Sequence, residues 1–118
     1  MATIDSHNIH AYGQNIGISA QKVRLVADMV RGMDVNQAYA MLQFVPKLAA
    51  KSVSKVLASA MANAEENYGV SRDDLYVYRI HIDEGPTRRW RKFGARGRFK
   101  PWLRRSSHIT ITLREREE

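Results

Sequence analysis

One internal segment of this chain carries its whole excess of positive over negative charge. Between Gly85 and Arg105 the sequence has nine Lys or Arg residues and no Asp or Glu. The whole chain has 19 basic and 12 acidic residues, so the rest of it has ten basic and twelve acidic residues. Such a segment repels itself and is costly to order unless a polyanion supplies negative charge. The charge distribution therefore indicates a nucleic-acid partner and a segment that cannot join an apolar core.

Length and composition bound the class of protein. With 118 residues, 44% of them hydrophobic, the chain suits one small folded domain. We expect no membrane span, because no apolar run is long enough, and no secretion, because Met1–Tyr12 lacks the features of a signal peptide. The absence of Cys excludes disulfides and thiolate metal sites, and we predict neither a metal nor a cofactor.

Apolar residues at helical spacing predict two helices early in the chain. Ser19 is a suitable N-cap for the first helix, and Gly32 is suited to end it. Asp34 with Gln37 resembles a capping box at the start of the second helix. The residues expected to be buried are Val23, Val26, Ala27, Val30, Val35, Ala38, Tyr39 and Leu42.

A third, longer helix is predicted after Pro46, which suits its first turn. The helix should reach about Asn67, with Gly69 just beyond its end. Its buried stripe should comprise Ala49, Val53, Val56, Leu57, Ala60, Met61 and Ala64.

From Leu75 the hydrophobic period changes to the alternation of a β-strand. The strand that begins there should place its apolar side chains on one face. A second strand is predicted near the C-terminus, and residues 8–13 could form a third strand. The sequence therefore predicts an α+β fold: three helices packed on a small antiparallel sheet, with a long protruding β-hairpin. The side chains that define the two strands are Tyr76, Tyr78, Ile80, Ile82, Ile109, Ile111 and Leu113.

The basic segment is predicted to fold back on itself about Arg96. In that register Trp90 faces Trp102 and Phe93 faces Phe99. Two aromatic pairs in one register favour a hairpin, since each such pair contributes about 0.2–1 kcal/mol.

The same register places like charges opposite each other, which is destabilising.

About ten residues per arm at about 3.3 Å each give the hairpin a projection of about 33 Å. A compact body of this size has a radius of gyration of only about 13 Å. We therefore expect one domain with a body at 1–84 and 106–118 and a protruding hairpin at 85–105. The register pairs Arg88 with Arg104, Lys92 with Lys100, Ile80 with Thr112 and Ile82 with Thr110.

The hairpin supplies the main candidates for RNA binding, because Arg and Lys contact phosphates and aromatic rings stack on bases. Secondary candidates lie on the helices, where a solvated surface is an equal alternative. His108 is interpreted as a hydrogen-bonding or RNA-facing residue rather than a proton shuttle. The hairpin candidates are Arg88, Arg89, Trp90, Arg91, Lys92, Arg96, Arg98, Lys100, Trp102, Arg104 and Arg105, and the helical ones are Lys22, Arg24, Arg31, Lys47, Lys51 and Lys55.

Three other classes of protein are alternatives to an RNA-binding one. An architectural DNA-binding protein that lays a β-ribbon in a groove is the principal alternative. A cationic surface-binding protein acting on membranes or on acidic partners is disfavoured, because the arm has no amphipathic helical period. An enzyme is the least favoured class, because no convergent catalytic set occurs.

Several motifs, in this order and spacing, resemble the bacterial-type large-subunit ribosomal protein L twenty-two family. Together they cover nearly the whole chain from Ile18 onward. They are ISAQKVRLVADMVRG at Ile18–Gly32, AMANAEEN at Ala60–Asn67, DEGPT at Asp83–Thr87, ARGR at Ala95–Arg98 and HITITL at His108–Leu113.

The resemblance implies a non-enzymatic structural constituent of the large ribosomal subunit, in the cytoplasm. It implies binding to several domains of the large ribosomal RNA, a role in early subunit assembly, and a hairpin that lines the nascent-peptide exit tunnel. Near the tunnel constriction the tip would approach ribosomal protein L four and the passing nascent peptide, and changes there are associated with macrolide response. Carried over by position, the tip comprises Phe93, Gly94, Ala95, Arg96 and Gly97.

The chain departs from the family pattern at this tip. Family members commonly have Pro-Arg before the Ala matched to Ala95, whereas this chain has Phe93 and Gly94. Contacts assigned to that arginine therefore do not carry over.

Overall fold

The computed structural model describes residues 8–93 and 99–116, and for 88–93 and 99–104 it describes the backbone. No helix in this part of the chain is long and apolar enough to cross a membrane. The elements in chain order are β1 (Ile9–Ile16), α1 (Ala20–Val30), α2 (Val35–Phe44), α3 (Leu48–Tyr68), the short 3-10 helix η2 (Arg72–Asp74), β2 (Leu75–Glu84), β3 (Arg88–Phe93), β4 (Phe99–Arg104) and β5 (Ser107–Glu115).

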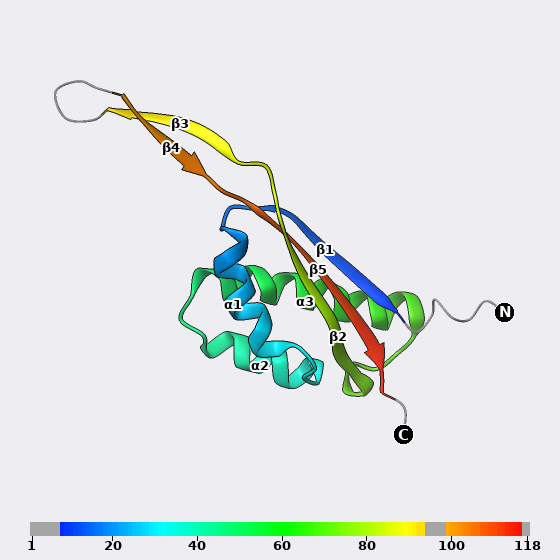
Figure 1. The fold of residues 1–118 in the computed structure, drawn as a ribbon. Helices are drawn as coiled ribbons and strands as arrows, with labels where there is room; N and C mark the ends of the chain where they lie inside the picture. The colour runs from blue at the N-terminus through cyan, green and yellow to red at the C-terminus, as the bar shows by residue number, and fades with distance from the viewer. Residues whose placement is uncertain (1–7, 94–98, 117–118) are drawn as a thin grey trace.

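The body is a three-stranded antiparallel sheet with helices on one face. The strand order is β1-β5-β2, so the C-terminal strand lies in the middle. The three helices cover one face of this sheet and leave the other uncovered (Figure 1). The helices and the inward residues of the strands share one hydrophobic core. The predicted α+β fold is confirmed, and the predicted N-terminal strand is present and reaches Ile16.

The predicted helices are confirmed, with two corrections. Every predicted core position of α1 and α3 is buried, and Gly32 and Gly69 end these helices with φ of +85° and +65°. On α2 the expected burial of Tyr39 is wrong, because its side chain is 38% exposed. Pro46 precedes the N-cap residue of α3, Lys47, and so lies outside the first turn.

The capping box predicted at Asp34 does not form. Asp34 is the N-cap residue of α2, but its side chain makes no capping hydrogen bond. Instead, Asp34 Oδ1 accepts a hydrogen bond from Arg116 Nε at 2.6 Å and forms an ion pair with Nη2 of the same guanidinium, also at 2.6 Å. The carboxylate therefore ties the end of the sheet to the start of α2, a partnership that local sequence cannot reveal.

A β-bulge at Tyr78 corrects the predicted pattern of β2. Val77 pairs with Leu113, whereas Arg79 pairs with Thr112, so the ladder shifts by one residue between them. The bulge reverses which alternate positions face the core. As a result Tyr76 and Tyr78 are only partly buried, whereas the core residues of β2 are Leu75, Val77, Ile80 and Ile82.

The predicted pairing of Ile80 with Thr112 and of Ile82 with Thr110 is also wrong. Ile80 pairs with Ile111, and Ile82 pairs with Ile109. Apolar side chains therefore face apolar side chains across the two strands, which buries both members of each pair.

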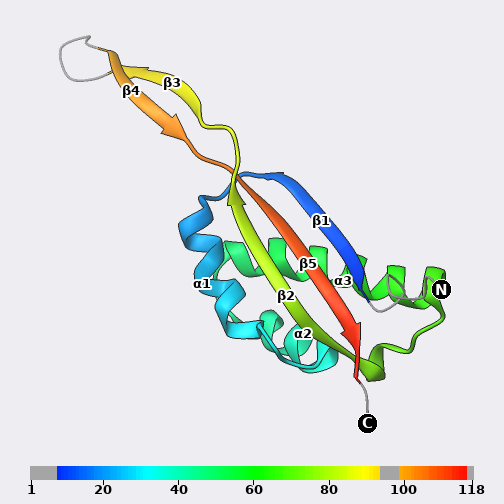
Figure 2. The same ribbon diagram turned by 45° about the vertical axis from the view of Figure 1, so that its right-hand side comes forward.

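The predicted hairpin register is confirmed for the described arms. Strands β3 and β4 form a separate two-stranded sheet that projects from the body (Figures 1 and 2). The radius of gyration is 17.5 Å, against about 13.5 Å for a compact chain of this length. The predicted apex at Arg96 lies outside the described residues. The pairs are Arg88 with Arg104, Trp90 with Trp102, Lys92 with Lys100 and Phe93 with Phe99.

The junction between body and hairpin adds a second one-residue offset. Between the Glu84–Ser107 pair and the Arg88–Arg104 pair, three residues on one side face two on the other. The Gly85 N–H donates to Ser106 O at 2.9 Å, and Ser106 Oγ donates to Pro86 O at 2.7 Å. A Cβ on Gly85 would lie 2.5 Å from Ser106 Oγ, so this close approach favours glycine.

Candidate nucleic-acid interface

Strands β3 and β4 carry the basic residues in register along the projecting hairpin. Their Cα partners include two pairs of like charge, Arg88 with Arg104 and Lys92 with Lys100. Like charges directly opposite are destabilising in the isolated protein, and bound phosphates would relieve that repulsion. Arg105 is exposed and directly follows β4. The remaining predicted site and tip residues, Gly94, Ala95, Arg96, Gly97 and Arg98, lie outside the described part of the chain.

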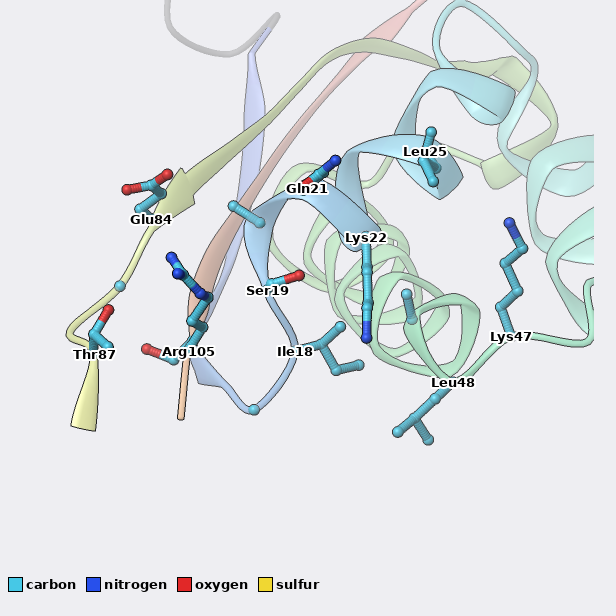
Figure 3. Close-up of a pocket in the computed structure, with 15 residues that line it drawn as sticks. Ile18, Ser19, Gln21, Lys22, Leu25, Lys47, Leu48, Glu84, Thr87 and Arg105 are labelled. Carbon is cyan, nitrogen blue, oxygen red and sulfur yellow. The ribbon is translucent and has the colours of Figure 1, made fainter. Parts of the chain in front are cut away.

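A groove of about 980 Å³ lies where the hairpin leaves the body. Three cationic side chains line it, each from a different part of the fold: Lys22 on α1, Lys47 before α3 and Arg105 after β4 (Figure 3). Glu84 is the single acidic residue among the lining residues. The groove thus brings a cation of the hairpin next to cations of the helical part of the body. The sequence could not predict this proximity, because the three residues are far apart in the chain.

The predicted lysine ridge lies on the exposed side of α3 and its N-terminus. Lys47, Lys51 and Lys55 are all exposed, and their four-residue spacing places them on one side. They line a second hollow of about 490 Å³ beside residues of α2. Lys47 lines both this hollow and the groove, so the ridge and the groove form a continuous cationic surface.

Arg24 and Arg31 have partners within the chain. Arg24 Nη2 donates to the main-chain carbonyl of Ile82, and Arg31 Nη2 donates to that of Ile80, each at 2.9 Å. Both carbonyls belong to β2, an edge strand of the sheet. Edge strands need their free backbone groups covered, so these arginines have a structural role. Their predicted contact with RNA stays a prediction.

His108 accepts a hydrogen bond rather than standing free. Its Nδ1 lies 3.1 Å from the backbone nitrogen of Asn15, whose φ is +53°. Because an amide N–H can only donate, Nδ1 must accept, and this hydrogen bond requires a neutral ring with its proton on Nε2. Within the described residues no three His, Cys, Asp or Glu gather to hold a metal.

A group of aromatic and cationic residues lies on the uncovered face of the sheet, and the sequence pattern did not predict it. The Arg114 guanidinium lies 3.6 Å from the centroid of the Tyr78 ring, and that of Arg116 lies 4.7 Å from the centroid of Tyr76. Alternation along β5, with Arg114 on the face opposite the core, was an available signal. On β2 the corresponding alternation was not visible, because the bulge at Tyr78 changes which positions face away from the core.

Comparison with known proteins agrees with these features. The family model for "Ribosomal protein L22p/L17e" matches residues 11–114. The chain is 45% identical to the large ribosomal subunit protein uL22 of Carboxydothermus hydrogenoformans, with 92% of this chain and 96% of the relative covered. It is 47% identical to the uL22 protein of Desulfitobacterium hafniense (92% and 95% covered) and 42% identical to that of Pediococcus pentosaceus (92% and 92%).

These matches span the helical body, the hairpin and the central strand. They confirm the resemblance found in the sequence motifs, and with it a structural protein rather than an enzyme. The chain therefore belongs to the ribosomal protein L22p/L17e family of large-subunit ribosomal proteins.

Proposed function

We propose that this protein binds the large ribosomal RNA through its basic hairpin and so supports early assembly of the large subunit in the cytoplasm. The body, residues 1–84 and 106–118, would rest on the RNA surface. The hairpin, residues 85–105, would run between RNA segments that belong to several domains and hold them together. In this role the protein is a scaffold, and its mechanism is electrostatic.

One observation carries the proposal: the hairpin register sets like charges directly opposite each other. The pairs Arg88–Arg104 and Lys92–Lys100 follow from the backbone pairing of β3 with β4. A hairpin that pairs cations with cations gains stability when phosphates surround it, since each contact also releases condensed counterions. The groove at the base extends the cationic surface onto the body through Lys22 and Lys47.

The test is a salt titration of binding to a large-subunit RNA fragment. The informative variant combines Arg88→Gln, Lys92→Gln, Lys100→Gln and Arg104→Gln, which removes both like-charge pairs and keeps the chain length. If all four contact phosphate, the log–log slope of affinity against salt should fall by about 3, at about 0.7–0.9 per contact. An unchanged slope would refute the proposal.

The matched control exchanges the two cations at the same positions: Arg88→Lys, Lys92→Arg, Lys100→Arg and Arg104→Lys. This variant keeps every charge, so its salt slope should equal that of the unaltered protein. Duplex DNA at the same salt serves as competitor. A preference for the DNA over the ribosomal RNA would favour an architectural DNA-binding protein instead.

We further propose that the hairpin lines the nascent-peptide exit tunnel, with its tip near ribosomal protein L four. Family membership supports this part of the proposal, together with the length of the projection, since the molecule measures 66 Å along its longest axis. A photo-crosslinking amino acid in place of Phe93 in translating ribosomes should label the nascent peptide and L four. Labelling confined to proteins of the subunit's outer surface would contradict this placement.

A further inference from the structure

The face of the sheet that the helices leave uncovered has an unusual composition for a solvent-exposed surface. Strands β1, β5 and β2 form this face (Figure 2). The burial patterns of the three strands assign to it the alternate positions on the opposite side from the core. None of them is aliphatic. Across the middle of this face two rows run from β1 through β5 to β2, Tyr12–Thr110–His81 and His10–Thr112–Arg79.

Strand β1 presents two aromatic rings on this face. Tyr12 is 65% exposed. Its ring lies 6.3 Å from that of His10, centroid to centroid, with an angle of 21° between the two planes. His10 Nδ1 is 3.0 Å from Thr112 Oγ1, which restricts the orientation of the imidazole. Two nearly parallel rings can receive planar groups in similar orientations, as successive bases of a single strand require.

Strands β5 and β2 add positive charge beside these rings. The guanidinium of Arg114 lies over the Tyr78 ring at 3.6 Å, and that of Arg79 lies 5.3 Å from the same centroid. Arg114 Nε also donates to Asn8 Oδ1 at 2.7 Å, which holds its plane in place. Neither arginine forms an ion pair with a described residue. Both charges therefore stay available to phosphate or to a stacked base.

We propose that this uncovered face binds unpaired nucleotides of the RNA, with Tyr12 as the principal stacking residue and Arg79 and Arg114 as phosphate or base contacts. Exposed aromatic side chains on a sheet are a general means of binding single-stranded RNA, because every base offers a flat face. A protein partner is the weaker interpretation, because the large aliphatic side chains that are exposed among those the structure describes, Leu25 and Leu48, lie on the helices instead.

This inference rests on the proposed RNA-binding function and adds a second contact surface of different chemistry. The hairpin recognises phosphates, which duplex and single strands share. The uncovered face requires bases that are not already paired. The two surfaces can therefore be separated by the kind of RNA that each binds.

The test compares a short oligouridylate with a duplex RNA of equal length, using the full chain at one salt concentration. Tyr12→Ala should weaken oligouridylate binding about 5- to 150-fold, the range for one lost stacked base, and should leave duplex binding unchanged. Tyr12→Phe keeps the ring and should bind as the unaltered protein does. Tyr68→Ala removes a tyrosine that is 45% exposed at the end of α3, a helix on the opposite side of the sheet from this face (Figure 1), and should have no effect.

Two results would overturn the inference. Either Tyr12→Ala binds oligouridylate as tightly as the unaltered chain, or it loses duplex affinity to the same extent. If binding to the ribosomal RNA fragment still falls steeply with salt in those cases, the hairpin proposal survives and this one alone fails. If the intact chain binds neither RNA, the proposed function itself is wrong.

A photo-crosslinker placed at Tyr12 tests the same surface in assembled large subunits. The expected product is a crosslink to an unpaired ribosomal nucleotide. A crosslink to a protein neighbour instead would identify the face as a protein interface and refute the proposal.

Discussion

Arg24 on α1 donates from Nη2 to the main-chain carbonyl of Ile82 on β2 at 2.9 Å, so a basic side chain of the helix completes the edge of the sheet. Arg31 makes the same kind of contact with Ile80, and the Gly32 N–H donates to Val77 O at 2.9 Å. Residues of α1 and of the turn that follows it therefore cover the outer edge of β2. Basic residues on one helix therefore serve two purposes, and exposure to solvent alone does not separate them.

Arg24→Met tests this structural role. Methionine keeps the apolar stem but removes the donor, and it leaves the carbonyl of Ile82 without its partner. We expect the free energy of unfolding to fall by about 1 kcal/mol, since water can reach part of this edge. Chemical denaturation measures the change. The slope of RNA affinity against salt tests the predicted RNA contact separately: it should fall by about 0.7–0.9 if Arg24 also binds a phosphate, and stay the same if its role is structural alone.

Lys22→Ala is the matched control, because Lys22 lies two positions away on the same helix and faces the groove. Its removal should change stability by less than about 0.5 kcal/mol. If Lys22 contacts a phosphate, the salt slope should fall by about 0.7–0.9. The opposite pattern, with Arg24 altering the slope and Lys22 the stability, would contradict the assigned roles.

Gly13→Ala tests how closely β1 approaches α3. A Cβ on Gly13 would lie 2.6 Å from Cγ2 of Val56, a buried and β-branched residue that has little freedom to move. We expect the substitution to destabilise the protein by about 1–3 kcal/mol through overpacking. Thermal or denaturant unfolding provides the measurement.

A double-mutant cycle with Val56→Ala separates this steric conflict from other effects of the alanine. Removing the valine methyl groups should relieve the conflict, so the double variant should be less destabilised than the sum of the single ones by at least about 0.5 kcal/mol. Gly17→Ala is the control, because a Cβ there meets no atom within 4 Å. Simple additivity at Gly13 and Val56 would show that the two residues do not collide.

Local signals predicted the elements of this fold but not its long-range contacts. Val23, Val26 and Val30 are spaced at the helical period, and this spacing alone predicts which side of α1 is buried. The signal is local, because it depends only on residues a few positions apart in the chain. The prediction of a capping box at Asp34 was wrong because the Asp34 carboxylate binds Arg116 instead of the backbone of its own helix. Arg116 is 82 residues away in the chain. A motif that depends on one carboxylate cannot be trusted when a distant arginine can bind that carboxylate.

The hairpin register was predictable because Trp90 and Trp102 identify it from both strands. The register within the body was not, because bulges shift it. One extra residue at Tyr78 and another within Gly85–Thr87 displace the pairing by one position each. Neither position has a composition that distinguishes a bulge from an ordinary strand or turn. For the same reason the aromatic and cationic face of the sheet was visible only after folding.

The ion pair between Glu65 and Arg72 predicts a small acid dependence of stability. Arg72 Nη2 donates to Glu65 Oε1 at 2.7 Å, and this hydrogen bond lowers the pKa of Glu65 below its ordinary value of 4.5. A carboxyl group with a lowered folded-state pKa stabilises the fold above its unfolded pKa, and this contribution is lost as pH falls through the folded value. The unfolding temperature of Glu65→Gln should therefore lie below that of the unaltered protein at neutral pH, and the two should converge in acid.

Glu66→Gln is the control for this measurement, since it removes the neighbouring exposed carboxylate and leaves the ion pair intact. High salt should also shrink the difference at neutral pH, because the pair is exposed and easily screened. A difference between Glu65→Gln and the unaltered chain that persists unchanged into strong acid would show that it does not arise from the carboxylate charge.

Lys51→Gln decides whether the lysine ridge of α3 touches RNA or is a solvated helix face. Lys51 is exposed in the first turns of α3, between Lys47 and Lys55. If it contacts a phosphate, the salt slope of RNA affinity should fall by about 0.7–0.9. Arg72→Gln removes the same charge in η2, beyond the opposite end of that helix, and should leave the slope unchanged. Equal changes in both variants would mean that only the net charge of the protein matters there, because a contact acts at one place whereas a long-range field does not.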